Sequence, residues 1–162
     1  MEPSRDDGRD ETPTERADRN LDELLQELRV ALPGVQVLFG FLLTVPFAQR
    51  FGRVTDFQEH VYLVTLLSSV AATALLIAPS AYHRLNFRQH DKQHIVEVAS
   101  RFATAGLAAL GFAMSGAVLL VTGVVFGDVT TGVTSAAVAS AFVGLWFVLP
   151  LRRRLAGRHE PS

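Results

Sequence analysis

Two long stretches of the chain, residues 102–126 and residues 130–151, contain no charged side chain. A helix at the surface of a soluble protein needs polar or charged groups every few positions along its outer face. The hydrocarbon core of a bilayer is about 30 Å thick, and a helix of about 20 apolar residues crosses it. Both stretches reach that length, so the sequence indicates an integral membrane protein.

Two further apolar runs precede a central interval that is polar and basic. No segment shows the alternation typical of a strand, so we expect an all-α fold, a four-transmembrane-helix bundle. Pro33 and Gly34 should interrupt the helix before the first span, and the second span should end at Pro79. The predicted spans cover about residues 34–50, 60–79, 100–126 and 132–151 of one membrane domain at residues 20–151.

The N-terminal region divides into two parts. Residues 1–19 are rich in Asp, Glu, Arg, Pro and Thr, so we expect a disordered charged tail. Asn20 and Glu23 have the spacing of a helix capping box, and leucines at helical spacing predict an amphipathic cytoplasmic helix over residues 20–32. Two interpretations stay open. Either this helix is a stem that packs its leucines on the rest of the protein, or Glu23 and Glu27 dock on the central interval or the C-terminal arginines.

The lysines and arginines are unevenly divided between the two ends of the predicted bundle. The N-terminal region, the central interval and a basic tail at residues 152–162 hold thirteen of them, and the other end holds only Arg50 and Arg53. Loops rich in Lys and Arg stay on the cytoplasmic side of a membrane. We therefore predict a multi-pass protein of the inner (plasma) membrane with both termini in the cytoplasm.

Small residues recur every fourth position in the last two predicted spans. Helices in a bilayer associate through close contact at such residues, because lipid tails are as apolar as leucine. We expect the two stripes to face each other. They consist of Ala105, Ala109, Ala113 and Ala117 in the third span, and Gly132, Ala136, Ser140 and Gly144 in the fourth.

Basic residues at the membrane boundary are the candidate contacts for anionic lipid headgroups or a partner protein. An ordinary loop that determines topology explains the same residues. They are Arg84, Arg88 and Lys92 in the central interval, and Arg152, Arg153 and Arg154 in the C-terminal tail. The net charge of −1 gives no reason to expect nucleic-acid binding.

His90, His94 and Glu97 lie one turn apart and would share one face of a helix. They stand among arginines and a lysine, which disfavour a bound cation, and cysteine is absent. We expect no metal site and no cofactor.

The remaining question is whether any residues could transfer protons or catalyse a reaction. Glu59 and His60 form either a proton relay at the non-cytoplasmic side or simply the start of a helix, where Asp56 and Glu59 have capping-box spacing. No serine is linked in position to a base, and no glycine-rich phosphate loop is present. The sequence does not predict an enzyme.

Several short segments resemble a known family of small four-span membrane proteins, common in actinobacteria and known only as a domain of unknown function. The resemblance covers about residues 20–125 and implies no established activity, although some relatives carry the label of a sodium:proton antiporter. The segments are Leu24 to Val30, Gly34 to Phe39, Phe41 to Phe47 with Arg50 and Phe51, Ile77 to Pro79, His83 and Arg84, Phe87 and Arg88, and Arg101 with Ala105 to Leu107.

An antiporter needs a carboxylate inside the membrane that exchanges a proton for an ion. None of the four apolar runs contains an ionisable side chain. We therefore expect a non-enzymatic membrane protein that acts through assembly, for example as a homo-oligomer, or through binding of lipids or partner proteins. Transport of small ions, as by a sodium:proton antiporter, is the alternative.

Overall fold

The computed structural model describes residues 12–49, 51–86, 92–149 and 151–152, and these residues are helical apart from short turns. Four helices are long and apolar enough to cross a membrane, and no strand occurs in the described residues. The predicted all-α bundle is confirmed. Its elements are α1 (Pro13–Thr44), η1 (Val45–Phe47), η2 (Phe51–Arg53), α2 (Asp56–Asn86), α3 (Lys92–Val125), α4 (Asp128–Val143) and the π-helical turn η3 (Gly144–Val148).

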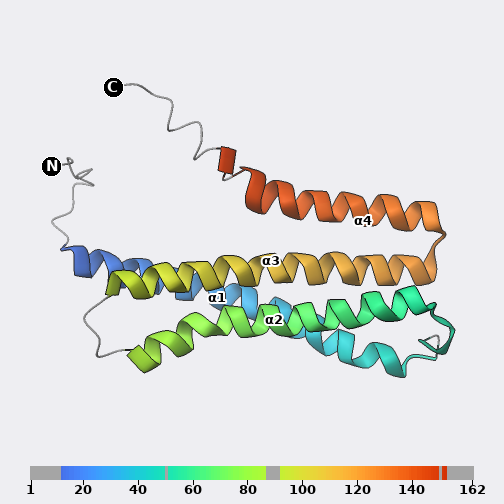
Figure 1. The fold of residues 1–162 in the computed structure, drawn as a ribbon, viewed down its shortest axis with the longest axis horizontal. Coiled ribbons are helices and arrows are strands. Elements are labelled where there is room, and N and C mark those ends of the chain that lie inside the picture. The colour runs from blue at the N-terminus through green and yellow to red at the C-terminus, as the bar shows by residue number, and fades with distance from the viewer. Residues whose placement is uncertain (1–11, 50, 87–91, 150, 153–162) are drawn as a thin grey trace.

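Successive long helices run antiparallel to each other (Figure 1). The start of α1, the end of α2, the start of α3 and the end of α4 lie at one end of the bundle, which we call the terminal end. The connections from α1 to α2 and from α3 to α4 lie at the opposite end, the turn end. The described parts of the basic interval, at the end of α2 and the start of α3, therefore lie at the same end as the start of α1 and the end of α4.

Helix α1 begins before the position predicted for it. Thr12 is the N-cap: its Oγ1 accepts a hydrogen bond from Glu15 N (3.3 Å), and its backbone N–H donates to the Glu15 carboxylate (2.9 Å). Pro13 follows at the first helical position, where its missing N–H costs nothing. The prediction of a disordered tail is wrong from residue 12 onward, because this capping box starts the helix at Pro13, about two turns before Asn20.

The predicted break at Pro33 and Gly34 is also wrong, since α1 continues through both for 32 residues. Pro33 is exposed, so its ring clashes with no other helix. Leu28 before it and Val35 after it belong to the same buried cluster. Packing on both sides of the proline thus holds the helix together and outweighs the lost backbone hydrogen bond.

Helix α2 also differs from the sequence-based expectation in two ways. Its capping box is formed by Thr55 and Gln58, whose backbone N–H groups donate to each other's side chains over 3.0 and 3.3 Å, and not by Asp56 and Glu59. It also passes through Pro79 as far as Asn86. Pro79 is almost completely buried, so tertiary packing again overrides the helix-ending tendency of proline.

Two buried clusters hold α1, α2 and α3 together. The stem cluster, at the terminal end, contains Leu21, Ile95 and Ala99, with Tyr82 packed against it. The membrane cluster follows toward the turn end, and its buried members are Leu28, Val35, Ala72, Leu76, Ala103 and Leu110. The N-terminal leucines therefore pack on α2 and α3, as the stem interpretation predicts. Glu23 lies 3.4 Å from Arg19 in an ion pair within α1. The docking alternative for Glu23 and Glu27 stays a prediction, because Arg88, Arg153 and Arg154 lie outside the described residues.

Helix α4 is the least buried part of the bundle. It lies close to α3 and to no other of the described helices, and only 6% of its candidate span is buried. Figure 1 shows it along the outer side of α3. Beyond Val143 it continues into the π-helical turn, where Trp146 packs edge-to-face on Phe142 with ring centroids 4.9 Å apart.

Candidate functional site

The described basic residues proposed to contact lipid lie at the terminal end. Arg84, close to the end of α2, and Arg152, beyond α4, are both exposed. Lys92 begins α3 and is placed by its backbone. Arg88, Arg153 and Arg154 lie outside the described residues.

The histidine cluster is described only in part, since His90 lies outside the described residues. His94 and Glu97 are exposed on the first turns of α3. The Glu97 carboxylate accepts a 2.6 Å hydrogen bond from the Arg101 guanidinium, one turn further along. Within the described residues no three His, Cys, Asp or Glu side chains gather as a metal site requires.

Glu59 and His60 are neighbours on the first turns of α2, and both are exposed. The His60 ring is engaged with its own helix, because Nδ1 lies 2.7 Å from the Asp56 carbonyl oxygen. No hydrogen bond joins the two side chains in the part of the chain that the structure describes. The structure therefore does not assemble the predicted proton relay.

The two stripes of small residues do not face each other. Ala113 is completely buried and Ala109 packs on the membrane cluster of α1, α2 and α3, whereas Ala105 is exposed. Gly132, Ala136 and Ser140 are also exposed, and a Cβ added to Gly132 or Gly144 would meet nothing within 4 Å. The expected pairing is wrong because α3 turns most of its alanine stripe toward α1 and α2.

Other glycines make the close helix contacts instead. An added Cβ at Gly111 of α3 would lie 3.6 Å from Phe142 and Trp146, and one at Gly123 would lie 3.7 Å from Thr131. On the opposite side of α3, an added Cβ at Gly106 would lie 2.8 Å from Leu76 of α2. Sequence reasoning missed these three glycines, because they follow no fourfold repeat.

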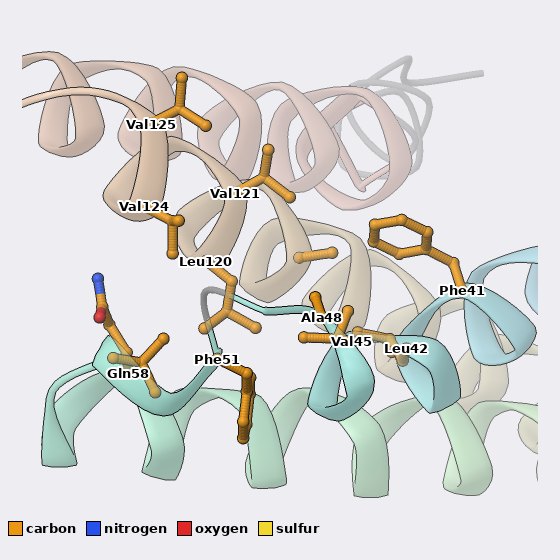
Figure 2. Close-up of a pocket in the computed structure, with 12 residues that line it drawn as sticks. Phe41, Leu42, Val45, Ala48, Phe51, Gln58, Leu120, Val121, Val124 and Val125 are labelled. Atoms are coloured by element: carbon orange, nitrogen blue, oxygen red, sulfur yellow. The ribbon is translucent and has the colours of Figure 1, made fainter.

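An apolar cleft of about 180 Å³ lies at the turn end between α1 and α3. Gln58 is the one residue with a side-chain amide among those that line the cleft. Close by, the Tyr62 hydroxyl donates to the Leu42 carbonyl oxygen (3.0 Å) and fixes the end of α1 against α2. Figure 2 shows the cleft between its labelled walls, which are Phe41, Leu42, Val45, Ala48 and Phe51 on one side and Leu120, Val121, Val124 and Val125 of α3 on the other.

A larger cavity of about 480 Å³ lies between α2, α3 and α4. Its lining residues are apolar except for His60 near the turn end and Thr65, Ser115 and Ser135. The hydroxyl groups of Thr65 and Ser115 donate to their own helices, and that of Ser135 is buried. A recess of about 170 Å³ adjoins it toward the turn end and shares Val61 and Leu119 with it. The recess is more polar, because Thr55, Gln58, Asp128 and Thr131 line it.

Comparison with known proteins gives one match. No curated protein and no solved structure is similar to the chain. Residues 10–150, most of the chain, match the profile of a family that is described as "Family of unknown function (DUF6328)". A match of that extent, together with four helices able to span a membrane, establishes that the chain belongs to the family of unknown function DUF6328.

Proposed function

We propose that this protein is a non-enzymatic membrane protein that acts by assembling with a second copy of itself through helix α4. One observation carries the proposal. Helix α4 packs on α3 alone, yet it presents Gly132, Ala136 and Ser140 on its exposed surface at fourfold spacing.

A stripe of small residues gives a helix no advantage if the helix contacts only lipid. In a bilayer, small residues favour association because they let two helix backbones approach closely, and dispersion contacts and weak hydrogen bonds then hold the helices together. A symmetric contact between two α4 helices is the simplest use of the stripe, since two-fold dimers are the commonest oligomers. The Ser140 hydroxyl would lie within this contact.

The basic residues at the terminal end support anchoring of the assembly on anionic headgroups, with both termini in the cytoplasm of an inner membrane. Arg84 and Arg152 are exposed at the same end of the bundle. Each basic residue near an anionic surface contributes about 1 kcal/mol of attraction. No observation favours ion transport as a second function, because the described acids lie at the ends of the candidate spans.

The test compares Ser140→Leu with Ala141→Leu, a matched change at the next exposed position of α4. The native protein should be a dimer by single-molecule photobleaching in dilute liposomes. Ser140→Leu should shift it toward the monomer and Ala141→Leu should not. A monomeric native protein, or equal dimer fractions in all three, would refute assembly through this face.

A further inference from the structure

The buried hydroxyl of Ser135 differs from those of the buried residues Thr65, Ser69, Thr122 and Thr131. Each of these donates to a carbonyl three or four residues back, as in Thr65 to Val61 O (2.6 Å) and Ser69 to Leu66 O (2.7 Å). Ser135 Oγ is buried and has no hydrogen-bond partner in the described part of the chain. A buried polar group without a partner is unfavourable, and Ser135 also lines a cavity, so its hydroxyl would gain a hydrogen bond by turning toward a ligand there.

The cavity that Ser135 lines has the size and lining of a ligand site. Its volume of about 480 Å³ falls in the range of about 300–1,000 Å³ typical of sites for small molecules, which are apolar with a few placed polar groups. Val64, Phe112 and Ala139 are among its apolar walls. Helices α2 and α4 do not approach each other closely, so a membrane-soluble molecule can enter between them.

The polarity of the site changes along the bundle as the polarity of a phospholipid does. The apolar cavity suits an acyl chain, and the adjoining recess at the turn end carries Gln58, Thr131 and the carboxylate of Asp128. Asp128 and Ser135 are seven residues apart on one helix, which is about 10 Å. That spacing is comparable with the distance between a headgroup amine and an ester carbonyl.

We propose that the cavity and the recess together bind one molecule of phosphatidylethanolamine. Its acyl chain fills the cavity, and its ammonium group pairs with the Asp128 carboxylate. The Ser135 side chain turns toward the cavity, and its hydroxyl donates to an ester carbonyl of the lipid. The negative charge of Asp128 selects against anionic headgroups at this site. This lipid site shares Ala136 with the small-residue stripe of α4, but lipid binding does not depend on self-assembly.

The experiment is native mass spectrometry of the delipidated protein, titrated with palmitoyl-oleoyl phosphatidylethanolamine or with the phosphatidylglycerol of the same chains. The native protein should bind one phosphatidylethanolamine per chain saturably and prefer it about fivefold, as expected for one charge at a membrane surface. Asp128→Asn should remove the preference. Ser135→Ala should weaken binding of both lipids about fivefold, as for loss of one hydrogen bond.

Two pairs of variants separate the site from general contact with lipid. Ala139→Phe fills the cavity and should abolish the saturable binding, whereas Ala137→Phe, at an exposed position of α4, should leave it intact. Ser100→Ala, at an exposed position of α3 that lines neither the cavity nor the recess, is the control for Ser135→Ala. Equal binding of the two lipids overturns the assignment of the headgroup. Unchanged binding in both Ala139→Phe and Ser135→Ala overturns the site, and the milder serine variant keeps the test decisive if the phenylalanine variant does not fold.

Discussion

Gly116 of α3 lies against Thr65 of α2 so closely that a Cβ on Gly116 would overlap the Thr65 hydroxyl oxygen and lie 3.2 Å from Thr65 Cβ. Thr65 is itself buried and donates its hydroxyl to Val61 O. Gly106 has the same relationship to Leu76, three turns away. These two glycines set the distance between the two helices that form the centre of the bundle.

Gly116→Ala should therefore destabilise the protein by about 1–3 kcal/mol, the usual cost of overpacking. Gly40→Ala is the control, because its Cβ would meet nothing within 4 Å and alanine has the higher helix propensity. Thermal unfolding in one detergent gives both values. A Gly116→Ala protein as stable as the native one would show that α2 and α3 can separate freely.

Leu76→Ala should cost about 2 kcal/mol, at the lower end for loss of a buried leucine, because the unfolded span rests in lipid rather than water. Leu76 is completely buried in the membrane cluster. Leu67→Ala, at an exposed position of the same helix, should change the stability by less than about 0.5 kcal/mol. The comparison uses titration with a denaturing detergent, and equal losses would contradict the placement of the core.

The orientation in the membrane can be measured with single cysteines, because the native chain has none. Gly127→Cys at the turn end and Arg152→Cys at the terminal end are both at exposed positions. The excess of Lys and Arg near the terminal end predicts that an impermeant maleimide labels Gly127→Cys in intact cells. Arg152→Cys should be labelled only after the cells are opened, and the reverse result would invert the topology.

Glu15 should titrate below the usual range of a glutamate. The Thr12 backbone N–H and then its hydroxyl donate to the carboxylate and lower the pKa of Glu15. A lowered pKa in the folded state means that the cap stabilises the helix fully above the pKa of the unfolded chain and loses this effect as the pH falls through the folded value. A carboxyl NMR titration measures the pKa, and Thr12→Ala, which keeps the backbone donor, should raise it part of the way back.

The four helices were predictable because uncharged runs of bilayer length leave few alternatives. Helix ends were less predictable. Pro33 and Pro79 both indicated a boundary, yet both lie inside helices, because packing of residues on either side outweighs the local cost of a proline. The start of α1 was missed for a related reason, since the charged composition of the first residues hid the capping box of Thr12 and Glu15.

The contacts between helices could not be predicted from spacing alone. The stripe at Ala105 to Ala117 looks equally suited to any neighbouring helix, and only the arrangement of three helices decides which side of α3 meets which partner. Ser135 gave no signal in the sequence, because any serine in a span can donate to its own helix. Its missing partner becomes visible only once a cavity between three helices is defined.

Helix α1 passes from the stem cluster into the membrane cluster as one rod of 32 residues, about 48 Å long at 1.5 Å per residue. No turn interrupts this helix between the two clusters. A change in the tilt of its apolar half therefore also changes the direction of its charged half. Local thinning of the bilayer, by changing this tilt, would cause the Thr12 end, outside the membrane, to move.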